Sequence, residues 1–329
     1  MEDIKKLFDS FSSLKVGVIG DVMLDTYMWG KVDRISPEAP VPVVSLKKWE
    51  LRIGGAGNVA LNVQSLGAQV FLLSVTGNDE NGRKLEKLFR HNNISTDYIL
   101  KSASRVTTNK IRVISRNQQM MRLDEEVTGD LETGDEENIL KKVSSFIEKE
   151  DPDVLIFEDY NKGVLTEKVI RDVIDLCRKS GVITAADPKR KNFFSYQGIE
   201  IFKPNLKEVK EGLNILFDEP DISLLETIHI ELQSLLHHDV SFITLSDKGV
   251  FYQFGERTAV IPSHLRSIAD VSGAGDTVIA VAALVYSATK NVHLMAEIAN
   301  IAGGMVCEEV GTVAINKEKL QHECELLLS

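Results

Sequence analysis

Short apolar runs and amphipathic segments alternate along most of the chain. Residues 15–20 form a β-branched run that ends at Asp21, which is typical of a strand buried on both faces. Similar runs predict strands at residues 70–75, 153–157, 182–186, 199–202, 240–245 and 249–254. Apolar positions predict helices at residues 55–66, 136–148, 166–179, 224–236, 277–286 and 317–328. This order predicts a doubly wound, mostly parallel α/β sheet flanked by helices, with ligands bound at the carboxyl ends of its strands.

Two segments interrupt the alternation. Residues 27–53 contain Pro37, Pro40 and Pro42 within strand-like runs, and residues 105–124 are rich in Arg, Thr and Val. Neither segment has a helical period, so we expect both to contribute to a small separate β-sheet. Because no repeat, low-complexity tract or linker divides the sequence, residues 1–329 are predicted to form one domain with this sheet inserted.

Composition restricts the class of protein. The 329 residues are 43% hydrophobic, enough for one large core, and the net charge of −11 argues against nucleic acid as a partner. No apolar run reaches the ~20 residues that span a bilayer, and the N-terminus does not resemble a signal peptide. Cys177, Cys307 and Cys324 are widely spaced, which predicts neither disulfides nor a zinc site and favours the cytoplasm. His237 and His238 end a helical pattern, and we expect both at the surface.

Residues 270–277, DVSGAGDT, carry the most specific chemistry. Gly273 and Gly275 can adopt backbone angles closed to other residues, so that successive N–H groups, with that of Ala274, can point at one oxyanion. The apolar helix that follows adds the positive end of its dipole. Asp276 lies in the first turn of this helix, where it can accept a proton. Phosphoryl transfer requires such an anion hole beside a base, although a glycine-rich turn capped by an acid is the alternative.

This string resembles the signature D-[TS]-x-G-A-G-D of the ribokinase-like (PfkB) family of sugar kinases. The resemblance implies a ribokinase-like fold, ATP and Mg²⁺ as cofactors, and a β-sheet lid over the sugar. It also implies that Asp276 is the catalytic base and that Gly273, Ala274 and Gly275 form the anion hole. A nucleotide-cofactor dehydrogenase is disfavoured because no G-x-G-x-x-G follows the first strand.

Residues 54–58, GGAGN, open a predicted helix and resemble the first signature of the family, G-G-x-G-x-N, shortened by one residue. The resemblance places Gly55 and Asn58 at the sugar, and a close-packed glycine turn is the alternative. Asp21 and Asp25 flank the end of the first strand. The resemblance implies that the Asp after that strand binds sugar hydroxyls, and we favour Asp21 over Asp25. Both carboxylates could instead cap the turn.

Residues 204–208, PNLKE, resemble the N-x-x-E motif of the family. This resemblance implies that Asn205 and Glu208 hold Mg²⁺ through water, since Mg²⁺ keeps much of its hydration shell, and that Leu206 and Lys207 lie at the nucleotide. An N-cap with a capping box is the alternative.

A second nucleotide motif follows at residues 244–249, TLSDKG. It resembles the T-x-G-x-x-G loop of the family, which implies that Thr244, Ser246 and Gly249 contact the nucleotide. Ser246 stands where the family has Gly, and an ordinary β-hairpin is the alternative. Asn300 and Gly303 fall on a later helix, where these kinases form the wall of the adenine site.

The substrate is suggested by strings at residues 34–44, 107–119, 122–124, 159–163 and 187–189. They resemble the heptose-phosphate kinases of lipopolysaccharide core synthesis. A sugar phosphate needs cations in an acidic protein, and these strings supply Arg34, Lys110, Arg112, Arg116, Arg122, Lys162 and Lys189. The alternative for each is a solvated position or an ion pair with Asp124 or Glu125. Asp159 and Asp187, at predicted strand ends, are further sugar-pocket candidates or caps. Glu158 replaces a small residue and would acidify the pocket if it points inward.

The resemblance implies ATP-dependent phosphorylation of D-glycero-D-manno-heptose 7-phosphate at the anomeric hydroxyl. Apolar lid residues such as Val41 and Val113 favour a homodimer formed through the lids. No H-x-G-H string occurs, so we expect no nucleotidyltransferase domain and adenylyl transfer by a separate protein. The alternatives are a kinase for another sugar or sugar phosphate, and a sugar-binding regulator without turnover, against which the intact Asp276 argues.

Overall fold

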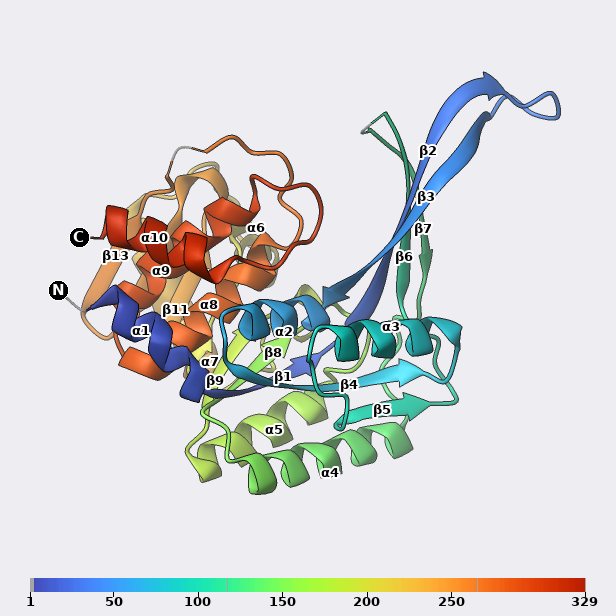
Figure 1. Ribbon diagram of the computed structural model, residues 1–329. Coiled ribbons are helices and arrows are strands. Elements are labelled where there is room, and N and C mark those ends of the chain that lie inside the picture. Colours follow the sequence, from blue (N-terminus) through green and yellow to red (C-terminus); the bar gives the residue numbers. More distant parts are fainter. Residues whose placement is uncertain (1–2, 117, 265, 329) are drawn as a thin grey trace.

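A mostly parallel sheet forms the centre of the molecule (Figure 1). The computed structural model describes residues 3–116, 118–264 and 266–328. Within them, nine strands lie in the order β13-β12-β11-β10-β9-β8-β1-β4-β5, and β12 pairs antiparallel with β11 and with β13. The bounds are β1 Lys15–Gly20, β4 Gln69–Gly77, β5 Ile99–Ser102, β8 Val154–Glu158, β9 Ile183–Asp187, β10 Ile201–Phe202, β11 Val240–Thr244, β12 Val250–Phe254 and β13 Arg257–Ile261. The predicted doubly wound sheet is confirmed.

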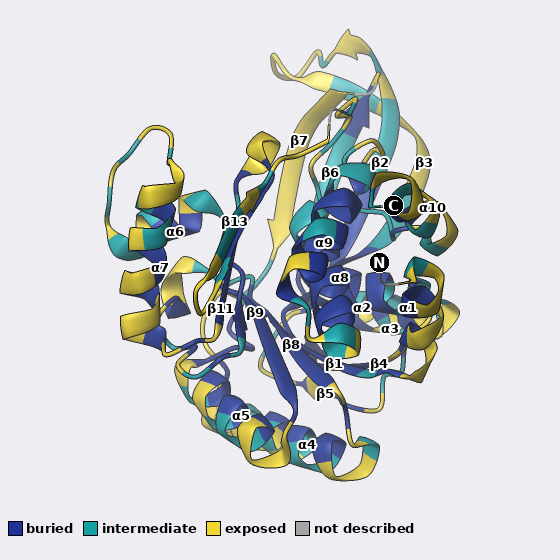
Figure 2. Ribbon diagram, turned by 90° about the vertical axis from the view of Figure 1, so that its left-hand side faces the viewer, coloured by how far each residue is buried: buried dark blue, intermediate teal, exposed yellow. Residues whose placement is uncertain are grey.

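Helices cover both faces of this sheet (Figures 1 and 2). Strand residues alternate between the faces, so that Val154 and Ile156 belong to one hydrophobic cluster and Leu155 and Phe157 to the other. The first cluster includes residues of α1, α2, α8, α9 and α10, and the second includes residues of α4, α5 and α7. The bounds are α1 Ile4–Ser10, α2 Ala56–Ser65, α3 Glu80–His91, α4 Thr133–Glu150, α5 Glu167–Ser180, α6 Leu206–Leu213, α7 Ile222–Leu236, α8 Ala274–Thr289, α9 Val292–Val306 and α10 Lys317–Leu327.

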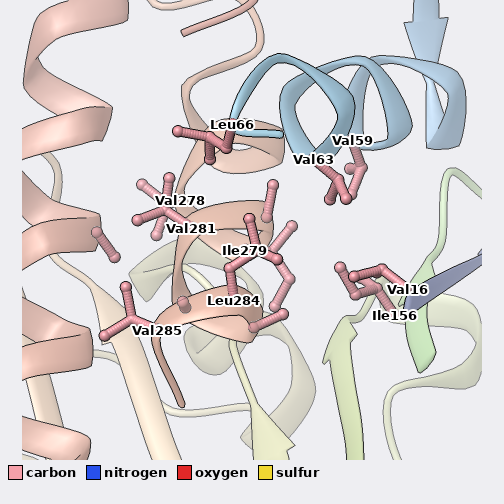
Figure 3. Packing of buried hydrophobic residues seen from close by; sticks show 14 of the residues in the cluster. Val16, Val59, Val63, Leu66, Ile156, Val278, Ile279, Val281, Leu284 and Val285 are labelled. Carbon is pink, nitrogen blue, oxygen red and sulfur yellow. The ribbon is translucent and has the colours of Figure 1, made fainter. Parts of the chain in front are cut away.

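Helix α8 is deeply buried. Every residue from Asp276 to Tyr286 is buried, because α8 packs against α2, α9 and the ends of β8 and β9. Figure 3 shows Ile279 and Leu284 of α8 in the cluster that contains Val16 and Ile156 of the sheet. A helix that is apolar all round is stable only in such a place. Its N-terminus lies near the carboxyl ends of the strands, since a Cβ at Gly275 would lie 3.4 Å from Oδ2 of Asp187, which ends β9.

Strand order reverses beside β1. The chain places β4 on one side of β1 and β8 on the other, and both pairings are parallel. Crossovers from neighbouring strands therefore leave in opposite directions at this point, and the carboxyl ends of β1 and β8 border a crevice. Gly20 of β1 pairs with Glu158 of β8, which in turn pairs with Asp187 of β9.

A second sheet projects from this body as a lid (Figure 1). Its strands lie in the order β3-β2-β6-β7, with bounds β2 Val22–Ile35, β3 Pro42–Gly55, β6 Asn109–Ser115 and β7 Gln118–Glu125. The predicted separate sheet is thus present, but it begins at Val22 rather than residue 27. Only Asp21 separates β1 from β2, so the apolar run continues without a visible break. Asn117, within one of the lid strings, lies outside the described residues.

Three further observations bear on the sequence predictions. Helices α1, α3 and α6 and strands β5 and β13 were not among the elements predicted. His238 is 1% exposed, so the surface position predicted for it is wrong, whereas His237 is exposed. His238 is buried because its Nε2 shares the hydroxyl of Ser241 with Nδ1 of His229, at 2.6 and 2.8 Å. No helix of the described residues is long and apolar enough to cross a membrane.

Candidate active site

The N-terminus of α8 presents backbone N–H groups. Gly273, its N-cap, has a φ of 80°, and a Cβ there would lie 2.8 Å from Nδ2 of Asn58. The turn therefore requires glycine. Ala274 donates to the Val271 carbonyl at 3.3 Å, whereas the N–H groups of Gly275 and Asp276 have no backbone acceptor within the described residues. We call residues 273–276 the phosphate cradle, because free N–H groups at the positive end of a helix bind anions.

Neutral donors hold both carboxylate oxygens of Asp276. Asn58 Nδ2 donates to Oδ2 at 2.7 Å, and the Tyr160 hydroxyl donates to Oδ1 at 2.8 Å. Burial raises the pKa of Asp276, while the hydrogen bonds from Asn58 and Tyr160 act in the opposite direction. A carboxylate whose pKa is raised is a better proton acceptor when it is ionised. The geometry thus gives Asp276 the orientation and the basicity that a general base needs.

Charged side chains form a row at the ends of three neighbouring strands. Glu158 ends β8, Asp187 ends β9, and Lys203 directly follows β10. Lys203 is 2% exposed, and its Nζ lies 2.8 Å from Oδ2 of Asp187. A Cβ at Gly275 would lie 3.4 Å from that oxygen and 3.8 Å from Nζ of Lys203. The row therefore adjoins the phosphate cradle, and Lys203 supplies a fixed positive charge beside it.

Asp187 and Glu158 differ in their partners. Although burial pushes the pKa of Asp187 up, the ammonium groups of Lys189, at 3.0 Å, and Lys203 hold it below its ordinary value. Both oxygens of Glu158 are buried without a hydrogen-bond partner within the described residues. Burial, and then the charges of Asp187 and Asp276, raise the pKa of Glu158 well above its ordinary value. Glu158 is thus buried beside Asp187 and Asp276, where its carboxyl group is harder to ionise than that of an ordinary glutamate.

The N-x-x-E motif forms a capping box at the start of α6. The Glu208 N–H donates to Oδ1 of Asn205 at 2.9 Å, and the Asn205 N–H donates to Oε2 of Glu208 at 2.8 Å. Oε1 of Glu208 pairs with Lys189 at 2.7 Å. Both oxygens of Glu208 are thus engaged, which suits contact with a hydrated ion better than direct coordination. Leu206 is half-buried, and the exposed Lys207 lies 3.8 Å from Glu211.

No direct metal site is preformed in the described part of the chain, where no three His, Cys, Asp or Glu side chains are arranged to hold an ion. Oxygen groups that suit Mg²⁺ are nevertheless present, because Asp187 borders the phosphate cradle and shares Lys189 with Glu208. The donor set therefore fits a hydrated Mg²⁺ that also binds nucleotide phosphates.

The T-x-S-x-x-G segment is a hairpin turn between β11 and β12, and its predicted contact with the nucleotide stays a prediction. Ser246 has a φ of 58°, the conformation that favours the glycine it replaces. Gly249 has a φ of 97°, and a Cβ there would lie 2.0 Å from the carbonyl oxygen of Ile261. Thr244, at the carboxyl end of β11, pairs with Asn205 in an isolated bridge. This bridge brings the two nucleotide motifs together.

Asn300 and Gly303, the two nucleotide-site candidates on α9, make contacts within the protein. Asn300 Nδ2 donates to the carbonyl oxygen of Pro262 at 2.8 Å. A Cβ at Gly303 would lie 2.6 Å from Val278, so this glycine allows α9 to approach α8 closely. Their predicted contact with adenine stays a prediction.

Asp21 stabilises the loop after β8. Its carboxylate accepts hydrogen bonds from three backbone N–H groups of residues 160–164, at 2.9, 3.0 and 3.0 Å, and it is 2% exposed. Gly55 has a φ of 61° and packs against the Asp21 carbonyl oxygen, 2.3 Å from where its Cβ would be. Because these three donors engage both oxygens of Asp21, the preference for Asp21 over Asp25 as the sugar ligand is not supported.

Asp159 also serves this loop. Its Oδ1 accepts from the Asn161 N–H at 2.7 Å and its Oδ2 from the Tyr196 hydroxyl at 3.1 Å. Burial, and then the charge of Asp21, raise the pKa of Asp159 to about 6. These hydrogen bonds are those of a residue that caps a loop, which was the alternative to a place in the sugar pocket.

Asp25 occupies a different place from the one predicted for it. It lies within β2, pairs with Nη1 of Arg112 at 2.5 Å, and is 2% exposed. A Cβ at Gly54 would lie 2.5 Å from Oδ2 of Asp25, so the glycine turn that leads to Asn58 passes directly over this carboxylate. Asp25 and Arg112 therefore link the lid to the glycine turn that precedes Asn58, the hydrogen-bond partner of Asp276.

Two lysines meet at the base of the lid. Nζ of Lys162 pairs with Glu126 at 2.8 Å, and Nζ of Lys110 lies 3.8 Å from both Glu126 and Asp124. Burial, and then the charge of Lys162, lower the pKa of Lys110. Lys110 has no ion pair closer than 3.8 Å within the described residues, so the two lysines are a candidate cationic group for a second phosphate.

The other lid arginines are less close to the centre of the site. Arg122 forms a bidentate pair with Asp124, at 2.9 and 3.0 Å, which is the ion-pair alternative. Arg34 and Arg116 are exposed near the outer ends of β2 and β6. Figure 1 shows these outer ends pointing away from α8, so the fold of one chain does not bring them to Asp276.

Comparison with known proteins identifies the family to which this geometry belongs. Residues 13–319 match the description "pfkB family carbohydrate kinase". The chain belongs to the pfkB family of carbohydrate kinases. The predicted ATP-dependent sugar kinase and its ribokinase-like fold are thereby confirmed.

Relatives and solved structures agree with this assignment. The chain is 37% identical over 316 residues to the bifunctional protein HldE of Sulfurimonas denitrificans, covering 96% of this chain and 65% of the relative. It is 38% identical over 303 residues to HldE of Aliarcobacter butzleri, covering 92% and 63%. The chain therefore spans less than two thirds of the length of these relatives.

Two solved structures share the fold. Phosphofructokinase-2 from Escherichia coli, in complex with substrates and products, superimposes with a TM-score of 0.78 at 17% identity, covering 96% of this chain and 100% of that one. Arabidopsis thaliana ribokinase, complexed with ribose and ATP, gives 0.71 at 16% identity, covering 94% and 98%. At this identity the likeness shows the fold alone.

Sequence reasoning did not identify two residues of the site. Tyr160 is a partner of Asp276, and Lys203 is the buried cation beside the phosphate cradle. A signal existed for Lys203, since a lysine directly after a predicted strand stands where ligands bind. Tyr160 carried no signal beyond its place after a strand end.

Proposed function

We propose that this carbohydrate kinase phosphorylates D-glycero-D-manno-heptose 7-phosphate at the anomeric hydroxyl, with ATP as donor. The observation that carries the reaction type is Asp276, oriented by Asn58 and Tyr160 beside the phosphate cradle. The lid strings and the similarity to HldE proteins over more than nine tenths of the chain support the heptose-phosphate type of sugar kinase.

Asp276 accepts the proton of the attacking hydroxyl. In the free protein its two oxygens face Asn58 and Tyr160, and a sugar hydroxyl that approaches Oδ1 takes the place of the Tyr160 contact or joins it. The neutral donors hold the carboxylate in one rotamer without neutralising its charge. Orientation of this kind supplies much of the rate in phosphoryl transfer.

The phosphate cradle and Lys203 bind the transferred phosphoryl group. The N–H groups of Gly275 and Asp276 point from the positive end of α8, and Lys203 is fixed beside them by Asp187. Mg²⁺, held through water by Asn205 and Glu208, would neutralise charge on the phosphates when bound. These groups act where negative charge develops in the transition state.

The sugar phosphate lies between the body and the lid. Asp25, rather than Asp21, is the carboxylate at the glycine turn, and we assign it to sugar hydroxyls together with Asn58. Lys110 and Lys162 are the cations we assign to the 7-phosphate, with Arg112 next to them. When the substrate phosphate binds, it replaces part of the attraction that Glu126 exerts on these lysines.

The assignment is tested by a comparison of acceptors. ADP formation from MgATP is measured with heptose 7-phosphate, fructose 6-phosphate and ribose, and we expect the highest kcat/KM with the heptose. Higher kcat/KM with another acceptor would assign the enzyme to that sugar, the second candidate. Binding without turnover by any acceptor would contradict the kinase assignment itself.

We also propose a cytoplasmic homodimer that forms through the lids. Every residue of β7 is exposed, and the lid exposes Trp49, Met121 and Leu123 by 58%, 56% and 49% (Figure 2). Such apolar strand surfaces favour association. The cysteines of the described residues are free thiols, as in a reducing compartment. Light scattering at micromolar concentration should give twice the monomer mass, and a monomer would overturn the proposal.

A further inference from the structure

Arg52 reaches from the lid to a loop near the end of the chain. It lies on β3, and its Nη1 donates to the carbonyl oxygens of Val310 at 2.9 Å and Thr312 at 3.2 Å. Gly311, between them, has a φ of 74°, and a Cβ there would lie 2.6 Å from the same Nη1. The loop backbone therefore closes around the guanidinium in a conformation that favours glycine.

Two lid residues hold the guanidinium in place. Nε of Arg52 donates to Oε1 of Glu50 at 2.7 Å, and its central carbon lies 4.8 Å from the centre of the Tyr27 ring. A planar guanidinium fixed by an ion pair and an aromatic face loses little further freedom when it binds carbonyl groups. The guanidinium of Arg52 is consequently held in one orientation toward the loop.

The same loop forms one wall of the phosphate cradle. The Gly311 N–H donates to Oδ2 of Asp270 at 2.9 Å, and Oδ1 of Asp270 accepts from the backbone and the hydroxyl of Ser272 at 3.0 and 2.8 Å. A Cβ at Gly273 would lie 3.3 Å from Cγ2 of Thr312. A shift of this loop would therefore move the turn that precedes α8.

We propose that Arg52 is a positioning residue that makes the geometry of the phosphate cradle depend on the lid. The chain of contacts runs from Arg52 through the 310–312 loop to Asp270 and Gly273. When the lid holds Arg52 against the loop, the turn before α8 is held with its N–H groups toward the phosphoryl site. The proposal rests on the proposed function only in naming this turn as the place where the phosphoryl group binds.

Arg52 also joins the two substrate sites. The strand that carries it continues into the glycine turn at Gly54 and Gly55 and then into Asn58, which contacts Asp276. Lid strands that settle on a sugar would thus place Arg52, and through it the phosphate cradle, in one movement. This coupling would favour transfer to the sugar over transfer to water.

The test compares Arg52→Ala and Arg52→Lys with the control Lys48→Ala. Lys48 is on the same strand and pairs with the same Glu50, at 2.8 Å, but its side chain is 66% exposed and makes no hydrogen bond or ion pair with the loop among the described residues. For each protein, kcat and KM are measured for the best acceptor and for ATP. Backbone hydrogen exchange of residues 268–276 and 308–314 is measured in the free protein.

We expect Arg52→Ala to lower kcat by about 100-fold, the scale of a small misplacement of reacting groups, and to change each KM by less than about 3-fold. Arg52→Lys should recover part of kcat, because an ammonium reaches one carbonyl but lacks the fork. Exchange in both segments should become faster in Arg52→Ala and stay at the wild-type rate in Lys48→Ala.

Two results would overturn the proposal. One is unchanged exchange of residues 268–276 in Arg52→Ala, since the loop would then not hold the turn. The other is a loss confined to KM for the sugar, which would make Arg52 a lid residue alone. Hydrogen exchange needs no substrate, so an enzyme that uses another acceptor, or none, would refute the proposed function while the exchange result still decides the role of Arg52.

Discussion

Replacing Glu158 with Gln should stabilise the protein by an amount that grows with pH. The carboxyl group of Glu158 is 0% exposed, and both of its oxygens lack a hydrogen-bond partner within the described residues. Burial, then Asp187 and Asp276, raise its pKa well above the ordinary value of 4.5. Gln is nearly the same size and cannot ionise, so the substitution removes the cost of keeping this group protonated.

The sign of this pH dependence follows from the number of protons that the folded and unfolded states bind. Above pH 4.5 the unfolded chain releases the proton of Glu158 while the folded protein keeps it, so the folded state binds more protons and loses stability as pH rises. Each pH unit in this range costs about 1.4 kcal/mol until the folded protein also releases the proton. Between about pH 5 and 7 the advantage of Glu158→Gln should therefore grow by up to about 2–3 kcal/mol.

Urea unfolding of both proteins at several pH values measures this difference. Groups common to both chains, including Asp187 and Asp276, contribute largely equally and cancel in the difference. The exposed Glu256→Gln serves as the control for removal of one carboxylate from the surface. A difference in unfolding free energy that does not change between pH 5 and 7 would refute the reasoning, because it would mean that Glu158 is ionised in the folded protein and has a partner.

Three further substitutions test the site. Asp276→Asn should keep the thermal unfolding temperature near that of wild type and lower kcat by ~100-fold or more, since an amide cannot accept the proton; activity within a few-fold of wild type would exclude Asp276 as the base. Lys203→Met should lower kcat/KM for ATP by at least about 10-fold and also lower the unfolding free energy, because Asp187 loses one of two cations; an unchanged kcat/KM in steady-state assays would remove Lys203 from the site. Arg112→Ala should raise KM for heptose 7-phosphate by about 10- to 150-fold with KM for ATP unchanged, and Arg112→Lys should recover part; an equal loss on a heptose without the 7-phosphate would show that Arg112 only holds the lid.

The motifs of the chain were enough to predict the fold class, and they singled out Asp276 and its glycines as the candidate catalytic residues. The buried run of β1, the apolar helix after Gly273 and the glycines around Asp276 each depend on local rules: strand and helix periodicity, and backbone angles that favour glycine. Such rules act over a few residues, so they can be read before folding. The prediction of Asn58 at the sugar rested on the family resemblance, and its hydrogen bond to Asp276, at 2.7 Å, was not predicted.

Roles that depend on the partner of a side chain were decided only by tertiary structure. A carboxylate after a strand can bind sugar, cap a loop or meet a lysine, and the sequence around Asp21 and Asp25 does not distinguish these uses. Packing places three loop N–H groups on Asp21 and leaves Asp25 with Arg112 at the glycine turn. Likewise, Lys203 is beside Asp187 because neighbouring strands end at the same level, a register set by the whole sheet.

The contact of Arg52 with the 310–312 loop shows most clearly the difference between what the sequence determines and what the tertiary structure decides. About 260 positions of chain separate the two partners, and no periodicity or motif connects them. The sequence alone determines that β3 is a strand and that Gly311 can adopt a positive φ. Only the folded chain brings the lid base against this loop, because α8, α9 and the central sheet pack so that both segments meet at the carboxyl ends of the strands.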